Sequence, residues 1–235
     1  MNKANFKKLL TDINIELSDN KYYLLEKYAV FLQEYNSHTN LTAIKDELEI
    51  FIKHFYDSLT ITKIIDLNEC SNLLDIGTGA GFPGVVLKIF YPHLKVTLLD
   101  SNNKKTKFLE ELLVILQLDN VIIINDRAEN YVKKTGNTFD IVTARAVANL
   151  RVLSEISLPF VKKEGFFIAM KGNAESEIKE AETTIKKMDS NIIKTSVLEL
   201  PENEGKRTLI KIKKERETNL TQLRPYNKIL KSALK

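Results

Sequence analysis

The chain has 235 residues, of which 43% are hydrophobic and 28% charged, with a formal net charge of +4. This composition excludes a disordered protein and predicts one α/β domain of ordinary size with an appended segment. Every apolar run is far shorter than the roughly twenty residues of a membrane helix, and the first residues lack the apolar segment of a signal peptide. Because the single cysteine, Cys70, also excludes an intrachain disulfide, we expect a cytoplasmic protein with no membrane association and a buried or loop thiol.

Helices are predicted to come first in the chain. Apolar residues recur at helical spacing over residues 21–35, and residues 45–63 indicate one or two further helices. Asn40 and Thr42, which lie between these segments, are expected to form turn or cap hydrogen bonds. Residues 1–66 are therefore predicted to form a helical extension that packs on the core of the main domain.

The most informative segment is NLLDIGTGAGFPG, residues 72–84. An apolar run ends there and is followed by glycines at 77, 79, 81 and 84, and Pro83 fits the first turn of a helix. Glycines at this density indicate positive φ angles or a backbone that a ligand approaches closely, although a tight turn without a ligand is the alternative. We predict a strand, a glycine turn and a helix that together bind a nucleotide-like ligand.

The glycine turn allows two interpretations. GAGFPG matches the GxGxxG fingerprint of dinucleotide-binding proteins, which would suit an NAD-dependent oxidoreductase. Counted from the end of the strand, DIGTGAG instead resembles motif I of class I S-adenosylmethionine-dependent methyltransferases. We favour the second reading because Gly77 then follows the strand directly. Asp75 is the acid near the end of that strand, and its carboxylate could engage the amino-acid part of the ligand, directly or through water.

A second acid follows the next predicted strand, KVTLLD at residues 95–100. Asp100 comes nineteen residues after Gly81, about where nucleotide-binding folds place a carboxylate that binds ribose. The alternative is that Asp100, or Ser101 beside it, caps the helix predicted over residues 103–116. Both roles can coexist.

Strands and helices alternate through the rest of the chain. Strands are predicted at residues 73–76, 95–100, 121–125, 139–144 and 165–170, helices at 85–90, 104–116, 150–160 and 175–188, and a closing strand pair at 196–200 and 208–213. This order predicts an α/β fold of the Rossmann-like type over residues 67–215, with a mostly parallel sheet and helices on both faces. The ligand is expected at the carboxyl ends of the strands.

Three further segments follow predicted strands: DRAE at 126–129, TARAVA at 143–148 and AMKG at 169–172. Together with NLTAI at 40–44, HFYDSL at 54–59, GAGFPG and LLDSNNKKTKFL, they make residues 40–171 resemble the RsmG (GidB) family, bacterial guanine-N7 methyltransferases of 16S ribosomal RNA. The resemblance implies a class I methyltransferase fold with an antiparallel final strand. It also implies S-adenosylmethionine as methyl donor, 16S rRNA or the small ribosomal subunit as partner, a soluble monomer and no metal.

The resemblance also implies which residues contact the donor. Combined with the acids and glycines discussed above, the expected cofactor-binding residues are Asp75, Gly77, Gly79, Phe82, Asp100, Ala128, Glu129 and Arg145. Phe82 could instead belong to the core. Arg145 could contact the donor or the target nucleotide, and it is the one candidate for a catalytic positioning role. The alternative is that Arg145 forms a structural ion pair. Because guanine N7 carries a lone pair and no proton, no general base is expected, and His54 is interpreted as a packed residue.

The basic part of the chain is its end. Residues 211–235 carry eight Lys and Arg against two Glu, so this part is +6 and the remainder −2. Basic side chains can contact RNA phosphates, although a solvated surface is the alternative. The candidates for phosphate contact are Lys104, Lys105, Lys107, Arg127, Lys171, Arg224, Lys228 and Lys231. The tail, residues 216–235, lacks the Gly-Pro element of many family members.

Two other functions stay open from the sequence. One is methylation of another RNA or of a small molecule. The other is a non-catalytic RNA-binding assembly factor that retains the fold; the intact glycine turn and Asp100 argue against it.

Overall fold

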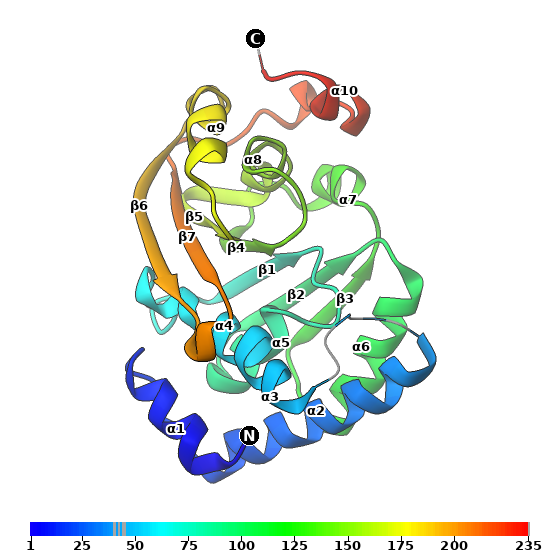
Figure 1. Cartoon of the computed structure of the whole chain (residues 1–235). Helices are drawn as coiled ribbons and strands as arrows, with labels where there is room; N and C mark the ends of the chain where they lie inside the picture. Colours follow the sequence, from blue (N-terminus) through cyan, green and yellow to red (C-terminus); the bar gives the residue numbers. More distant parts are fainter. Residues whose placement is uncertain (40, 42, 44–45, 235) are drawn as a thin grey trace.

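The computed structural model describes residues 1–39, 41, 43 and 46–234. Asn40, Thr42 and Ile44 of the NLTAI segment, and Lys45 at the start of a predicted helix, lie outside the described residues. The polypeptide forms a central sheet between two layers of helices, with the N-terminal helices at one end and the C-terminal segment at the other (Figure 1). The predicted boundary between extension and domain near residue 66 stays a prediction.

The sheet has seven strands in the order β3-β2-β1-β4-β5-β7-β6. Their bounds are β1 Asn72–Ile76, β2 Lys95–Asp100, β3 Val121–Asn125, β4 Phe139–Arg145, β5 Val161–Lys171, β6 Ser190–Glu199 and β7 Lys206–Lys214. Neighbours among β1 to β5 are parallel, whereas β7 is antiparallel to both β5 and β6. This confirms the mostly parallel sheet and the antiparallel last strand. Strand order reverses between β1 and β4, and such a reversal opens a crevice at the carboxyl ends of the strands.

The helical segments are α1 Lys3–Thr11, α2 Asp19–Thr39, α3 Glu47–Glu49, a π-helix Ile50–Tyr56, α4 Asp57–Leu59, a 3₁₀ turn Thr60–Lys63, α5 Gly84–Phe90, α6 Asn103–Leu116, α7 Ala128–Thr135, α8 Leu150–Ser157, a 3₁₀ turn Leu158–Phe160, α9 Glu175–Lys187, a 3₁₀ turn Pro201–Asn203, a 3₁₀ turn Leu220–Gln222 and α10 Tyr226–Lys231. The sequence had not predicted α1, α7 and α10. In α7 only Val132 is fully buried, so the apolar repeat is too weak to indicate a helix. Across the described ranges, no helix combines the length and apolar character needed to cross a membrane.

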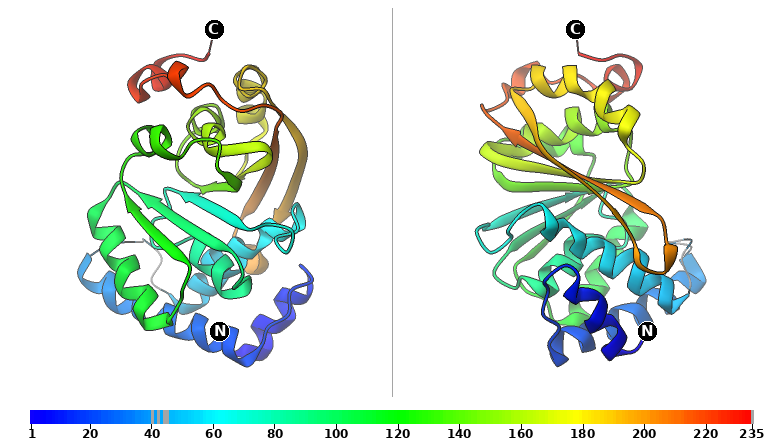
Figure 2. Two further views of the ribbon diagram at one scale, coloured as in Figure 1. Left: turned by 180° about the vertical axis from the view of Figure 1, so that it is seen from behind. Right: turned by 60° about the vertical axis from the view of Figure 1, so that its left-hand side comes forward.

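Alternate residues of the strands feed two apolar cores. Leu73 and Leu98 pack with Phe6 and Tyr28 in the core under α1, α2, the π-helix, α5 and α6. The other side of the strands packs against α7, α8 and α9, and Leu74 belongs to that core. Figure 2 shows these helices on opposite faces of the twisted sheet. Cys70 is buried at the edge of the first core, and burial raises the pKa of its thiol to about 11, as expected for an unreactive thiol.

Candidate functional site

A cavity of about 310 Å³ lies at the carboxyl ends of the parallel strands. It is lined by Ile76 and Gly77 at the end of β1, by Asp100 and Ser101 at the end of β2, by residues 126–129 after β3, and by Ala146 and Val147 after β4. Segments that are far apart in the sequence therefore meet where the strand order reverses. This is the edge at which the sequence predicted a ligand.

The four glycines of the turn have different roles. Gly77 and Gly79 adopt left-handed φ angles of +66° and +62°, Gly77 lines the cavity, and a Cβ on Gly79 would face open space. A Cβ on Gly81 would instead lie 2.6 Å from the Tyr28 hydroxyl, and one on Gly84 would clash with Leu98. Gly77 also allows close packing, because a Cβ on it would lie 2.6 Å from the Val147 side chain. Gly77, Gly81 and Gly84 thus permit close packing, whereas Gly79 leaves an open stretch of backbone that a ligand can approach.

Asp75 is placed differently from the expectation. Its side chain is fully buried, and Oδ2 accepts hydrogen bonds from the Thr78 hydroxyl at 2.7 Å and the Gly84 N–H at 2.8 Å. Among the described residues, Oδ1 has no hydrogen-bond partner. Burial raises the pKa of this carboxyl to about 6, although both hydrogen bonds oppose the shift. Asp75 thus holds the glycine turn from below and does not line the cavity, and its expected contact with the ligand stays a prediction.

Asp100 lines the cavity, as expected for a ribose ligand. Its Oδ2 accepts the Gly79 N–H at 2.9 Å, its Oδ1 accepts the Asn102 N–H at 2.9 Å, and the Lys105 Nζ lies 3.7 Å away. The capping alternative is corrected, because the side chain of Asn102 caps α6 and neither Asp100 nor Ser101 does. The carboxylate is therefore fixed by the backbone at the cavity wall.

The segment after β3 supplies the opposite wall. Arg127 precedes α7, Ala128 begins it and Glu129 lies in its first turn, and all three line the cavity. The Asp126 carboxylate accepts the Arg127 N–H at 2.7 Å, which shapes the approach to the helix. These positions are where the resemblance expects the adenine of the donor. Together with Asp100, the carboxylates of Asp126 and Glu129 give the wall acidic groups that suit a positively charged sulfonium.

Arg145 forms the structural ion pair that was the alternative to a ligand contact. Its guanidinium donates to Asp57 Oδ2 at 3.1 Å and to the Lys53 carbonyl at 2.9 Å, and it lies 3.0 Å from His54 Nδ1. Asp57 is 1% exposed and also accepts from the Arg207 Nε at 3.0 Å. The sequence analysis did not single out Asp57 or Arg207, because pairing across 150 residues leaves no local pattern. Donor contact by Arg145 stays a prediction.

Phe82 belongs to the core, which was its alternative role. Its ring is 4% exposed and stacks on His54 at 4.2 Å between ring centroids, and on Tyr28 at 5.2 Å. Burial, and then the positive charge of Arg145, lower the pKa of His54 to about 3, so this imidazole is neutral at physiological pH. His54 is a packed residue, as expected. Phe82 packs beneath the turn, and its expected contact with the donor stays a prediction.

The basic candidates fall into two groups. Lys171 donates to the Ala148 carbonyl at 2.7 Å and pairs with Glu177 at 2.9 Å, and Arg224 makes two bonds of 2.6 Å to Glu155. These two cations are already paired inside the protein, and their expected contact with phosphates stays a prediction. The other candidates are exposed or lie at the cavity: Lys104, Lys105, Lys107, Arg127, Lys228 and Lys231.

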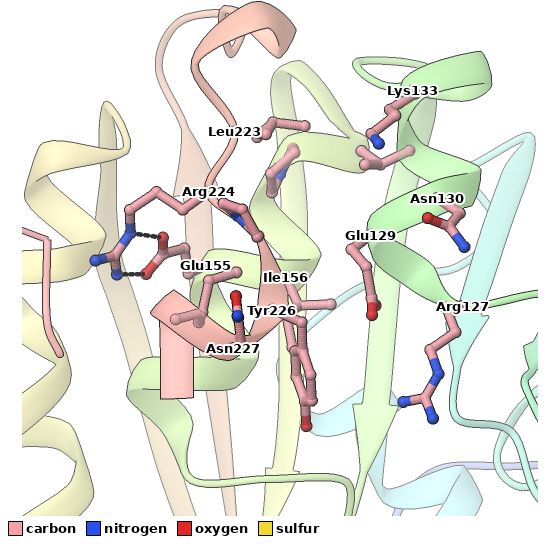
Figure 3. A pocket seen from close by; sticks show the side chains of 14 residues that line it. Arg127, Glu129, Asn130, Lys133, Glu155, Ile156, Leu223, Arg224, Tyr226 and Asn227 are labelled. Carbon is pink, nitrogen blue, oxygen red and sulfur yellow. Dashed lines mark hydrogen bonds and ion pairs between the residues drawn. The ribbon is translucent and has the colours of Figure 1, made fainter. Parts of the chain in front are cut away.

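The sequence analysis missed one wall of the cavity. Tyr226, at the start of α10, lines it together with Ile156 of α8. Both residues also line a neighbouring cavity of about 620 Å³ between α7, α8 and the C-terminal segment (Figure 3). The signal of the tail in the sequence is its charge, and a single tyrosine such as Tyr226 gives no pattern that would predict its place at the cavity.

Sequence comparisons identify close relatives. A model of the GidB family, described as rRNA small subunit methyltransferase G, matches residues 21–210. A protein named ribosomal RNA small subunit methyltransferase G from Staphylococcus epidermidis is 47% identical over 212 residues, which is 89% of each chain. A protein of the same name from Staphylococcus aureus is 44% identical over 211 residues, which is 89% of this chain and 88% of the relative.

Solved structures support the fold. The structure of M. jannaschii TYW2 in complex with AdoMet matches with a TM-score of 0.56 and 18% identity, over 68% of this chain and 75% of that one. A putative transferase from Pyrococcus horikoshii matches with a TM-score of 0.54 and 13% identity, over 67% and 62%. At these identities the likeness establishes a class I methyltransferase fold. Given the family match over most of its length, the chain belongs to the GidB family of rRNA small subunit methyltransferase G proteins.

Proposed function

We propose that this protein transfers a methyl group from S-adenosylmethionine to N7 of one guanine in 16S ribosomal RNA. The observation that carries the proposal is the cavity at the strand ends, where the backbone bend at Gly77 and Gly79, the fixed carboxylate of Asp100 and residues 126–129 meet. The relatives named ribosomal RNA small subunit methyltransferase G support the substrate class.

The residues present suit the donor. A carboxylate such as that of Asp100 can accept hydrogen bonds from both ribose hydroxyls, as in other nucleotide-binding folds. Adenine would lie against Ala128 and Glu129, and the amino-acid part would follow the bend at Gly77. The acidic groups of the wall favour binding of the donor, whose sulfur is positively charged, over the product, whose sulfur is neutral. The distance of these groups from the methyl group would decide how strongly they change the energy barrier to methyl transfer.

The proposed chemistry demands little from side chains. Guanine N7 attacks the methyl carbon with its lone pair while the bond from carbon to sulfur breaks, so the positive charge moves from sulfur to the base. No proton has to be removed, which is consistent with a neutral, packed His54. The rate would come from holding the two reactants in line, which in well-oriented intramolecular reactions is worth an effective concentration of about 10⁵ to 10⁸ M.

Cations near the cavity support RNA as the substrate. Lys105 and Arg127 line the cavity, and Lys104 and Lys107 extend the basic surface along the exposed side of α6. Such residues bind phosphates in a sequence-independent and salt-dependent manner. Lys228 of α10 is also exposed and is available for a further phosphate contact.

The test is methyl transfer with a matched variant. Purified protein, tritiated S-adenosylmethionine and either 30S subunits or deproteinised 16S rRNA from cells lacking the modification should give labelled N7-methylguanosine. Asp100→Asn should lower the rate by about ten-fold or more, because a good hydrogen bond to a charged group is worth about 1.5–3 kcal/mol. Glu182→Gln, in an exposed carboxylate of α9 that does not line the cavity, should leave the rate unchanged.

The outcomes separate the alternatives. Label in a different RNA or only in a small molecule would refute the 16S rRNA substrate. Donor binding without transfer to either ribosomal substrate would favour a non-catalytic assembly factor. Binding of NAD but not of S-adenosylmethionine would refute the assignment of S-adenosylmethionine as the ligand of this site.

We also propose that the enzyme acts as a monomer in the cytoplasm, where ribosomal subunits assemble. Light scattering during size-exclusion chromatography should give the mass of one chain, 26.9 kDa. A stable dimer at micromolar concentration would contradict this.

A further inference from the structure

The segment after β7 returns to the cavity instead of extending into solvent. It leaves the sheet past Thr218, whose N–H donates to Asn137 Oδ1 at 2.9 Å, passes above α8 and forms α10 beside it (Figure 1). The basic tail is therefore a folded part of the molecule over its described residues, up to Leu234.

Two arginines attach this segment to α8. Arg224 donates from Nε and a terminal nitrogen to the two oxygens of Glu155, each at 2.6 Å, and the Glu155 side chain is 4% exposed (Figure 3). Arg151 of α8 donates to the carbonyls of Ile229 at 2.9 Å and Ser232 at 3.1 Å, at the end of α10. Terminal carbonyls of a helix lack partners within the helix, so this guanidinium both satisfies them and fixes α10 in place.

Apolar contacts complete the attachment. Ile229 packs with Val152 and Ile156 in a small cluster, against which Tyr226 and Ala128 also pack. Ala128 is the residue against which the adenine is proposed to lie. The tail thus brings an aromatic ring to the same end of the cavity as Ala128. Figure 3 shows this ring beside Ile156, with Glu129 and Arg127 across the opening.

We propose that Tyr226 is a donor-binding residue whose ring forms a wall of the adenosine end of the site, and that α10 is the clamp that holds it there. This inference rests on the proposed function, which places adenine at Ala128. A flat π-surface next to a purine gains stacking energy, and removing an aromatic side chain that stacks on a base commonly weakens binding by about ten-fold or more.

The larger cavity explains why the clamp matters. Space of about 620 Å³ remains between α7, α8 and the tail, so the tail does not fill the region that it covers. Leu220, Leu223 and Leu234 pack the segment on the second core, and Asn137 and Lys187 make hydrogen bonds to Thr218 and Leu234. The contacts nearest Tyr226 are the Arg224 ion pair, the Arg151 hydrogen bonds and the Ile229 cluster. Loosening the Ile229 cluster, against which Tyr226 packs, would let the ring move away from the adenosine end while the sheet and its cores stay intact.

Calorimetric titration of the full-length protein tests the proposal. The ligands are S-adenosylhomocysteine and adenosine, which lack a transferable methyl group and share the adenosine part. Tyr226→Ala should weaken both by about ten-fold, whereas Tyr226→Phe, which keeps the ring, should bind within about two-fold of the wild type. Ile229→Ala should weaken both by a smaller factor, because it acts only by loosening the clamp. Leu230→Ala is the matched control, since this neighbour is 49% exposed and does not line the cavity.

The outcomes are distinct. If Tyr226→Ala binds both ligands as tightly as the wild type, or if Tyr226→Phe is as weak as Tyr226→Ala, the wall formed by the ring is refuted. If the wild type itself binds neither ligand, the donor site of the proposed function is refuted, and this inference falls with it. Far-ultraviolet circular dichroism of each variant should match the wild type, which separates loss of the ring from loss of the fold.

Discussion

Removing the Asp57 carboxylate should destabilise the protein more than any surface charge change. Asp57 is 1% exposed and joins two arginines whose side chains are 15% and 23% exposed: Arg145 lies 3.1 Å from Oδ2, and the Arg207 Nε lies 3.0 Å from both oxygens. Asp57→Ala leaves both guanidinium groups without their anion in a site that water reaches poorly. Breaking a buried ion pair in this way costs about 3–5 kcal/mol.

The same geometry predicts a graded series. Arg145→Met removes the hydrogen bonds to Asp57, to the Lys53 carbonyl and to His54, but Asp57 keeps both bonds from Arg207. The charged hydrogen bond to Asp57 alone is worth about 1.5–3 kcal/mol, and the total loss should stay below that of Asp57→Ala because no buried carboxylate is left unpaired. The double variant, Asp57→Ala with Arg145→Met, should lose less unfolding free energy than the sum of the two single variants. The reason is that the second substitution no longer leaves a buried charge without its partner. Arg216→Ala is the control: its pair with Asp189 spans 3.9 Å at 80% exposure, and its loss should stay within about 0.5 kcal/mol.

Urea unfolding followed by circular dichroism measures these free energies. With an unchanged slope, the midpoint should fall in the order Arg216→Ala, Arg145→Met, Asp57→Ala, and the melting temperature of Asp57→Ala should drop by roughly 10 °C. A loss below about 1 kcal/mol for Asp57→Ala would refute the reasoning. So would additive effects in the double variant, because they would mean that the two groups do not interact.

Two further predictions concern the glycine turn. Asp75 has a folded pKa of about 6 against an ordinary 3.8, so the folded state binds more protons between these values and this group loses stability as pH rises through 6. At 1.36 kcal/mol per pH unit, the unfolding free energy of Asp75→Asn should rise relative to that of the wild type by up to about 3 kcal/mol from pH 4 to pH 7. Urea unfolding measures this difference, and a difference that does not depend on pH would contradict the prediction. Gly79→Ala should cost about 1–2 kcal/mol for its left-handed φ alone, whereas Gly81→Ala should cost more because its Cβ meets Tyr28 and Val85 at 2.6 Å; equal losses in thermal unfolding would disprove the distinction.

Much of the fold was predictable because its signals are local. The strand that ends in Ile76, the glycine turn and the strand that ends in Asp100 all come from short apolar runs with clear breaks, and the structure confirms them. Helix α7 was missed because it buries little apolar surface of its own. The predicted helix over 45–63 is a series of short α, π and 3₁₀ segments from residue 47 on, a distinction that apolar spacing does not encode.

Side-chain partners were predictable only where they are close in sequence. Arg145 and Arg224 are both basic residues near the carboxyl edge, yet each pairs with an acid far away in the chain, Asp57 and Glu155. Composition makes such arginines candidates for phosphate or donor contact. Only the fold reveals which cations have already been neutralised by a buried carboxylate.

Asp75 and Asp100 show the same limit at the level of strand register. Each is an acid at the end of one of two neighbouring strands, and the sequence alone makes them equally good candidates for ligand contact. In the sheet, however, Asp75 is level with Leu98, so Asp100 lies two residues closer to the carboxyl edge, level with the start of the glycine turn. Asp75 is consequently covered by the first turn of α5, and Asp100 reaches the cavity. Because a shift of register by two residues preserves the side-chain alternation, hydrophobic patterning could not have separated a residue that supports the turn from one that lines the site.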